Sequence, residues 1–284
     1  MTVPASPESM SFLRDLVYRR SAIVLEADKQ YLFDSRLSPV AREAGLASID
    51  ELVSNMRKDP GAPLTRRVVE AMTTNETLFF RDVHPFEAMK ALLVPDLIRA
   101  RSAERSLRIW CAAASTGQEP YSIAMTLREH FPELATWKVQ ITATDLNAAV
   151  LERAREAKYR QLEVNRGLPA NFLIKYFERQ SADWRLNANI RDMVSFRELN
   201  LLDSWASLGP QDIVFMRNVL IYFDIETKRR LLGRVRQTLQ PEGFLVLGGA
   251  ETTTNLDEGY APVRVGKGVY FQSKSALRAM PSVA

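Results

Sequence analysis

The sequence predicts an α/β fold in which a helical N-terminal domain precedes a mostly parallel sheet with helices on both faces. The first 75 residues carry apolar side chains at helix spacing. From about residue 106, short apolar runs alternate with helical segments, which is typical of a parallel sheet with crossover helices. Between residues 159 and 198 this alternation breaks, which indicates a small inserted subdomain. We therefore expect an all-helical domain over residues 1–75 and a sheet domain over residues 76–284.

Helices are expected throughout the first 75 residues. Apolar side chains recur at helix spacing from Phe12 to Val17. The segment Ser48-Ile-Asp-Glu51 has the form of a capping box before another apolar stripe. Interruptions are expected at Pro39, at Gly45 and over residues 60–63, because proline and glycine disfavour a continuous helix.

The second part of the chain supplies the strands and helices of the sheet domain. Strands are expected over residues 107–113, 139–144, 212–216 and 244–248, with a hairpin over 263–271. Helices are expected from Pro120 onward, over 147–157 and over 224–239. Within the insertion, a helical stretch from Phe172 to Phe177 precedes two short strands, over residues 184–186 and 193–196.

Composition excludes several classes of protein. The chain has 284 residues, of which 46% are apolar and 25% charged, so it is neither disordered nor fibrous. Neither a membrane-spanning run nor a signal peptide is recognisable, so we expect a cytoplasmic protein without membrane insertion. The net charge of +4 is spread along the chain, which argues against nucleic acid as a partner. With Cys111 as its one cysteine and with two histidines, the chain is expected to hold no metal.

The turn after the first predicted strand is the first place to look for a ligand, because ligands bind at the carboxyl ends of parallel strands. It contains small residues and Gly117 but not the G-x-G-x-x-G pattern of a dinucleotide site. Glu119 at the start of the next helix suits a cationic ligand, or else simply complements the helix N-terminus. Asp145 ends the second strand, where it either accepts both hydroxyls of a ribose or caps the following helix. Together the two acids favour S-adenosylmethionine, which has an ammonium group and a ribose but no phosphate.

Further polar residues follow the later strands. Asn200-Leu201 and Arg217-Asn218 come after the predicted strands that end near residues 197 and 216. An asparagine there suits an adenine edge, although it is also an ordinary turn residue. Tyr222 follows in an apolar context and is equally compatible with the core.

Three long motifs resemble the chemotaxis receptor methyltransferases of the CheR type. They are Thr73-Thr-Asn-Glu-Thr-Leu-Phe-Phe-Arg81, Trp110-Cys-Ala-Ala-Ala-Ser-Thr-Gly-Gln-Glu-Pro-Tyr-Ser-Ile-Ala124 and Met216-Arg-Asn-Val-Leu-Ile-Tyr-Phe223, in the family's order and spacing. The resemblance implies a class I S-adenosylmethionine-dependent methyltransferase fold, Rossmann-like, with a helical N-terminal domain and an inserted antiparallel β-subdomain at about 159–198. It also implies S-adenosyl-L-methionine as methyl donor and S-adenosyl-L-homocysteine as product.

The resemblance also assigns roles to residues. The family's cofactor-binding positions match Asn75, Thr77, Arg81, Glu119, Asp145, Asn200, Leu201, Arg217 and Asn218. Its catalytic pair matches Arg81 and Tyr222. Basic residues of the N-terminal domain dock the receptor in this family, for which Arg36 and Arg42 are candidates. The segment 177–184 lacks the glycine of members that bind a receptor pentapeptide, which argues against such a tether.

The function implied is the methylation of glutamate side chains on the cytoplasmic signalling helices of bacterial chemoreceptors. Two alternatives stay open on the sequence. One is a signalling module that binds S-adenosylmethionine without catalysis, and the other is a carboxyl methyltransferase for small molecules.

Overall fold

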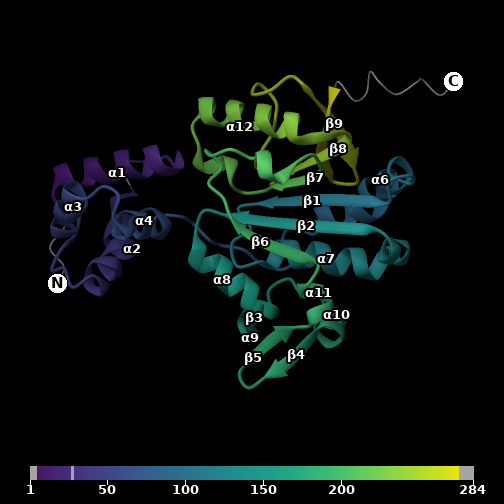
Figure 1. Cartoon of the computed structure of the whole chain (residues 1–284), viewed down its shortest axis with the longest axis horizontal. Helices are drawn as coiled ribbons and strands as arrows, with labels where there is room; N and C mark the ends of the chain where they lie inside the picture. The colour runs from purple at the N-terminus through teal and green to yellow at the C-terminus, as the bar shows by residue number, and fades with distance from the viewer. Residues whose placement is uncertain (1–4, 27–28, 275–284) are drawn as a thin grey trace. The chain divides into compact units, whose positions relative to one another are not determined.

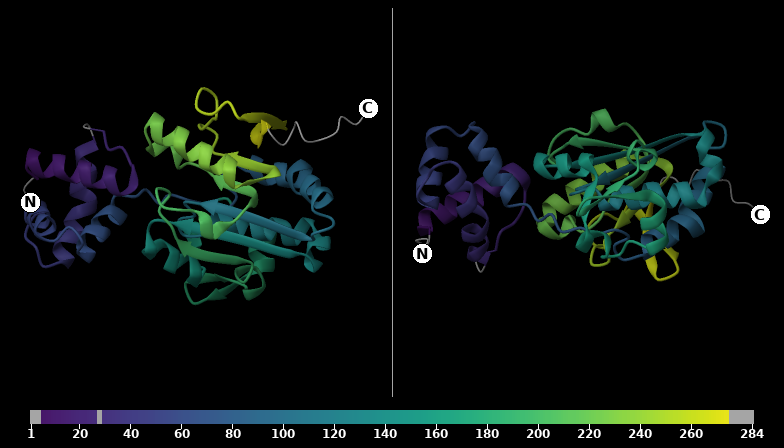
Figure 2. Two further views of the ribbon diagram at one scale, coloured as in Figure 1. Left: turned by 45° about the horizontal axis from the view of Figure 1, so that its top comes forward. Right: turned by 90° about the horizontal axis from the view of Figure 1, so that it is seen from below.

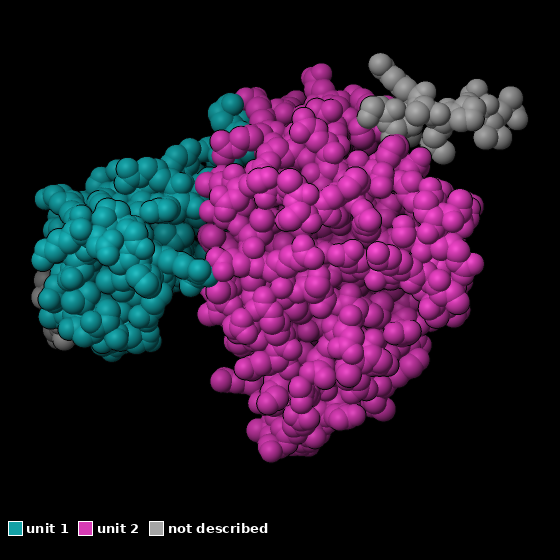
Figure 3. Space-filling model, viewed as in Figure 1, with its two compact units in different colours: residues 1–74, 222–227 teal, residues 75–221, 228–284 magenta. Residues whose placement is uncertain are grey.

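A computed structural model describes residues 5–26 and 29–274. Two compact units make up the chain (Figure 3). Unit 1 comprises residues 1–74 together with residues 222–227, and unit 2 comprises residues 75–221 and 228–284. Within the described ranges, no helix combines the length and the apolar character that crossing a bilayer requires.

Among the described residues of its N-terminal segment, unit 1 has four helices. They are α1 (Pro7–Ser21), α2 (Gln30–Glu43), α3 (Ile49–Lys58) and α4 (Pro63–Ala71). Apolar side chains spaced along them, such as Leu13, Phe33 and Leu52, are fully buried. Ser48 begins α3 as its N-cap, because its hydroxyl accepts the backbone N–H of Glu51 at 3.1 Å.

The expected interruption at Pro39 is wrong, because α2 continues through this residue. A proline inside a helix loses one hydrogen bond and crowds the preceding turn, at a cost of about 3 kcal/mol. Here Leu37, Val40 and Ala41 are buried on either side of it, and α2 packs against both α3 and α4. Burial of this face outweighs the local preference of one residue.

The last six residues of unit 1 come from a distant part of the chain. The Tyr18 hydroxyl donates to Oδ2 of Asp224 at 2.6 Å. The backbone N–H of Val24 donates to the carbonyl of Tyr222 at 2.9 Å. Residues 222–227 are thereby tied to the end of α1 and to the segment that follows it.

Unit 2 contains a seven-stranded sheet of order β6-β2-β1-β7-β8-β10-β9 (Figure 1). The strands are β1 (Ser106–Ala112), β2 (Lys138–Asp145), β6 (Val194–Glu198), β7 (Gln211–Met216), β8 (Leu239–Leu247), β9 (Tyr260–Val265) and β10 (Gly268–Ser273). The first five pair in parallel, and β10 joins β8 and β9 in antiparallel register. Figure 2 shows the twist of this sheet from two further sides.

Helices precede β1 or connect the parallel strands. They are α5 (His84–Ala88), the π-helical turn η2 (Met89–Leu93), α6 (Val94–Ala100), α7 (Gln118–His130), α8 (Ala148–Glu156) and α12 (Ile225–Thr238), with 3₁₀ turns η3 (Pro132–Thr136), η4 (Ala206–Leu208) and η5 (Leu220–Tyr222). Helix α7 begins two residues before Pro120, where it was expected to start. Proline is tolerated there because the first helical turn has no intrahelical acceptor for its N–H groups.

The insertion forms a separate three-stranded antiparallel sheet of order β3-β5-β4. Its elements are β3 (Lys158–Arg160), α9 (Gln161–Val164), α10 (Ala170–Tyr176), β4 (Phe177–Gln180), β5 (Asp183–Leu186) and α11 (Ala188–Arg191). Placing the strand near residues 193–196 in this subdomain was wrong. Residues 194–198 form β6, which pairs in parallel with β2 at the edge of the large sheet.

Candidate methyl-donor site at the carboxyl edge of the sheet

The order of the large sheet reverses between β1 and β7, since the chain proceeds from β1 to β2 and β6 before returning to β7. Ligands of such sheets bind outside the carboxyl ends of the strands at this reversal. The expected residues that follow β1, β2, β6 and β7 in unit 2 therefore gather along one edge. Residues 75–82 join them there through two contacts described below.

The loop after β1 is held close to the end of β2. Oδ2 of Asp145 accepts the backbone N–H of Ser115 at 2.9 Å, and Oδ1 accepts that of Asn147 at 2.9 Å. The Ser115 hydroxyl donates to the carbonyl of Asn75 at 2.7 Å. Asp145 is thus buried and anchored at the end of β2. The N-cap of α8 is Asn147, so the simpler interpretation of Asp145 as that cap is wrong.

Gly117 allows the tight turn from β1 into α7. Its φ of +92° is the left-handed conformation that glycine adopts without strain. A Cβ at this position would lie 3.0 Å from the Cβ of Ala154 and 3.2 Å from the Tyr159 hydroxyl oxygen. That hydroxyl donates to the carbonyl of Thr116 at 2.8 Å, so a strand of the inserted sheet supports the loop.

A buried ion pair bridges the reversal point. Nη1 of Arg217, after β7, donates to Oε2 of Glu119 at 2.7 Å. Nη2 donates to Oδ2 of Asp82 at 2.7 Å and to the carbonyl of Arg81 at 2.9 Å. The Arg217 side chain is 2% exposed and that of Glu119 is 13% exposed. Arg217 therefore connects the ends of β1 and β7 with the segment that contains Arg81.

Burial dominates the electrostatics of Glu119. It raises the pKa of the carboxyl group, while the nearby charges of Arg217 and Arg81 lower it and that of Glu251 raises it further. Glu119 is compatible with both interpretations, complementing the helix N-terminus and binding a cation, because it lies in the first turn of α7 and also faces the Arg217 guanidinium. At this partly buried position the Glu119 carboxylate would attract a cationic ligand.

The remaining expected residues have contacts or burial of their own. Oδ1 of Asn200 accepts the N–H of Leu202 at 3.0 Å, and Nη1 of Arg234 donates to the carbonyl of Leu201 at 2.7 Å. Asn218 and Thr77 are half-buried. Tyr222 is also half-buried, but it belongs to unit 1 and is described there.

These residues fit S-adenosylmethionine. The acids Glu119 and Asp145 suit its cationic centres and its ribose hydroxyls. Nε of Arg217 is buried and has no hydrogen-bond partner within the described part of the chain, so a donor is left for a carboxylate.

Two residues that support the loops at the carboxyl edge, Arg234 and Glu251, were not predicted from the sequence. Arg234 stacks over the ring of Trp205, with its Cζ 3.8 Å from the centroid, and also donates to the carbonyl of Asp203. Glu251 accepts backbone N–H groups from the loop after β7. The position of Glu251 just beyond the strand ending at Leu247 was an available signal, since strand ends at this edge carry the site.

Comparisons with known proteins agree with this architecture. The model of the "CheR methyltransferase, SAM binding domain" matches residues 75–268, and that of the "CheR methyltransferase, all-alpha domain" matches residues 8–73. Chemotaxis protein methyltransferase 1 of Pseudomonas aeruginosa is 44% identical over 95% of this chain and 99% of its own length. Chemotaxis protein methyltransferase Cher2 of Pseudomonas putida is 43% identical over 92% of this chain and 96% of its own length.

Among solved structures, the glycopeptide N-methyltransferase MtfA complexed with S-adenosylmethionine covers 70% of this chain and 69% of its own, with 16% identity and a TM-score of 0.33. The sheet order and the matched donor-binding domain define an S-adenosylmethionine-dependent methyltransferase of class I. Within that class, the chain belongs to the CheR methyltransferase family, which both of its matched domains show.

Proposed function

We propose that this enzyme transfers a methyl group from S-adenosylmethionine to glutamate side chains on the cytoplasmic signalling helices of bacterial chemoreceptors, forming methyl esters. The observation that carries the proposal is the match of both CheR domains, together with relatives named chemotaxis protein methyltransferases that align over nearly their whole length. Because these helices are cytoplasmic, we propose that the enzyme acts in the cytoplasm.

The chemistry requires alignment more than acid–base catalysis. A glutamate carboxylate has a reference pKa of about 4.3, so it is already ionised and nucleophilic at neutral pH. S-adenosylmethionine supplies an electrophilic methyl group, and the acceptor oxygen forms its bond to that carbon as the carbon–sulfur bond breaks. Holding reactants in line contributes up to about 7–11 kcal/mol in ideal cases.

We assign the donor site to the residues at the carboxyl edge. Glu119, held by Arg217, faces the cationic part of the donor, and Asp145 accepts from the ribose. Asn75, Thr77, Asn200, Leu201 and Asn218 complete the proposed set, with Arg81 beside Glu119.

Arg81 and Tyr222 are proposed to orient the acceptor carboxylate. The Arg81 guanidinium acts on the charge of Glu119 and donates to the carbonyl of Glu76 at 3.2 Å. A tight grip on the acceptor would slow the reaction, because the carboxylate loses its charge as the ester forms.

Receptor docking is proposed for the exposed Arg42 on α2. Arg36 is less suited to that role, because its guanidinium donates to the carbonyls of Met72 and Thr73 and to the Thr74 hydroxyl. The turn between β4 and β5 has no glycine, and we propose that this enzyme works without a pentapeptide tether.

The test is transfer of radiolabel from S-adenosylmethionine to membranes that carry the host's own chemoreceptors. We expect base-labile label, the mark of a carboxyl methyl ester. Arg81→Ala is expected to lower turnover far more than it lowers the stability of the fold, whereas Arg99→Ala, which removes a 72% exposed arginine from α6, leaves turnover unchanged.

Other outcomes point to other functions. Donor or product binding without any label favours a non-catalytic binding module. Label on free glutamate or short acids in the absence of receptor favours a small-molecule methyltransferase. Unchanged turnover of Arg81→Ala removes Arg81 from the active site.

A further inference from the structure

The carboxylate of Glu251 joins two loops at the carboxyl edge of the large sheet. Its Oε2 accepts the backbone N–H of Gly248 and that of Asn218, each at 2.8 Å. Its Oε1 accepts the N–H of Val219 at 2.9 Å and that of Ile221 at 3.2 Å. Two carboxylate oxygens offer about four lone-pair sites, so this arrangement uses the full accepting capacity of the side chain.

Three of these four donors lie in the loop between β7 and α12. Asn218, the first of them, has a φ of +57°, a left-handed conformation that is uncommon outside glycine. Such a conformation persists where surrounding contacts impose it. Here the Glu251 carboxylate fixes the backbone on both sides of the Asn218 side chain, through the N–H of Asn218 and that of Val219.

Gly248 provides a separate observation at the same place. A Cβ on this residue would lie 2.7 Å from Nδ2 of Asn218 and 2.9 Å from Oε2 of Glu251. Its φ lies outside the left-handed range, so the backbone alone does not require glycine here. A Cβ on Gly248 would displace the ends of these two side chains and crowd the backbone nitrogen of Asn218, so the close approach favours glycine here.

We infer that Glu251 is a positioning residue of the methyl-donor site, which holds Asn218 in the conformation that contacts the donor. This inference rests on the proposed function, because Asn218 is assigned to the donor site there. Glu251 itself acts through the backbone of the loop and need not touch the donor.

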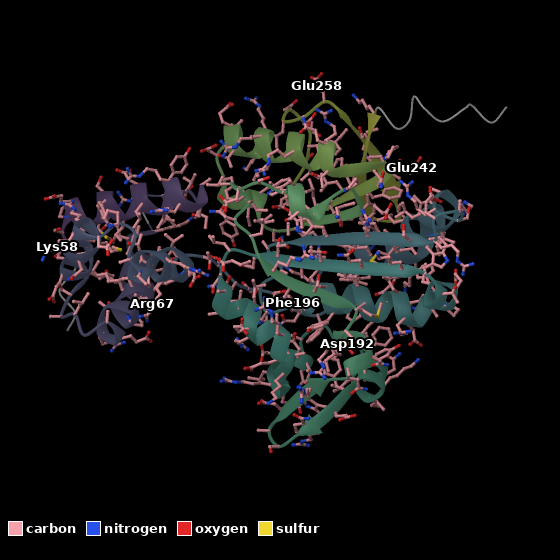
Figure 4. All side chains as sticks on the ribbon, viewed as in Figure 1. Lys58, Arg67, Asp192, Phe196, Glu242 and Glu258 are labelled. Carbon is pink, nitrogen blue, oxygen red and sulfur yellow. The ribbon has the colours of Figure 1, made fainter. Side chains whose placement is uncertain are left out.

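The experiment compares Glu251→Gln with the matched control Glu258→Gln. The glutamine amide keeps the size of the side chain but turns an NH₂ donor toward backbone N–H groups. Glu258 is exposed, and its side chain points away from the molecule near the start of β9 (Figure 4). Each change removes one negative charge from the segment between β8 and β9.

Three readouts are taken. Hydrogen exchange of the ligand-free protein over residues 217–222 is expected to quicken by about tenfold or more in Glu251→Gln. Calorimetry is expected to show a Kd for S-adenosylhomocysteine raised about tenfold, which is ~1.4 kcal/mol. Glu258→Gln is expected to leave both unchanged, and turnover is expected to follow the Kd. Gly248→Ala is expected to reproduce the exchange and binding changes without altering any charge.

A double variant separates positioning from general support. If Glu251 acts through Asn218, adding Asn218→Ala to Glu251→Gln weakens binding little further, because the contact is already lost. If the fold-losses in affinity of the two single variants multiply fully in the double variant, the inference is overturned. It is also overturned if Glu251→Gln exchanges faster but keeps its Kd and turnover unchanged, or if its exchange equals that of the control.

The outcomes also separate this inference from the proposed function. Failure of the unmodified enzyme to bind S-adenosylhomocysteine refutes the donor site, and the inference falls with it. Normal binding and methylation by Glu251→Gln refutes the inference alone. If Glu251→Gln melts below the assay temperature, Glu251→Asp, which withdraws the carboxylate by one methylene, is measured against the same criteria.

Discussion

Replacing Arg217 with methionine tests the interpretation of the reversal point as a buried ion pair. The change leaves Glu119 with its charge in a place where the side chain is only 13% exposed. Breaking a buried ion pair by removing one partner costs about 3–5 kcal/mol. The lost contact with Asp82 adds little, because that carboxylate is 46% exposed and well solvated. We expect the free energy of unfolding of unit 2 to fall by about 3 kcal/mol.

Denaturant unfolding followed by tryptophan fluorescence provides the measurement. All four tryptophans lie between residues 110 and 205, so the signal comes from unit 2. The double variant Arg217→Met with Glu119→Gln removes both charges, and we expect it to recover at least about 1 kcal/mol of the loss. A single variant as stable as the unmodified protein, or a double variant less stable than either single one, would falsify the reasoning.

Three other changes have expected outcomes. Gly117→Ala places a side chain at φ +92° against Ala154, and we expect it to destabilise unit 2 by about 1–3 kcal/mol in the same assay; no change would mean that the loop relaxes freely. Because burial raises the pKa of Glu119 above its usual 4.5, donor affinity measured by calorimetry is expected to fall as pH drops from neutral through that raised pKa. The contribution of Glu119 to folding stability has the opposite pH dependence, since it is greatest in acid and declines as pH rises through the same range. Glu119→Gln is expected to bind the donor weakly and with an affinity independent of pH; if its affinity still falls in acid, another group causes the pH dependence. Arg36→Ala is expected to quicken hydrogen exchange over residues 63–74, whereas Arg42→Ala leaves it unchanged, and equal effects would contradict the anchoring role of Arg36.

Much of the sheet was predictable because its central strands are buried on both faces. Such strands form continuous apolar runs in the sequence, as Ile213-Val-Phe-Met216 does. Glu119 and Asp145 could be singled out for a similar reason, since a polar residue directly after such a run lies at the ligand edge.

Long-range partners could not be predicted in the same way. Strand β6 is short and half-exposed, so its pairing with β2 depends on the sheet and not on its own pattern. The ion pair of Arg217 with Asp82 joins residues 135 positions apart. The contacts of Glu251 involve backbone N–H groups, which every residue except proline has, so side-chain identity reveals nothing about them.

The membership of residues 222–227 in unit 1 affects how the helical unit can be studied. The chain passes from unit 1 to unit 2 after residue 74, returns at residue 222 and leaves again after residue 227. Deleting residues 1–74 would therefore remove Val24, which donates to the Tyr222 carbonyl, and Tyr18, which donates to Asp224. A truncated enzyme that loses activity would not separate lost receptor docking from a displaced tyrosine. Point substitutions on exposed helical surfaces, or Tyr18→Phe alone, would separate the two.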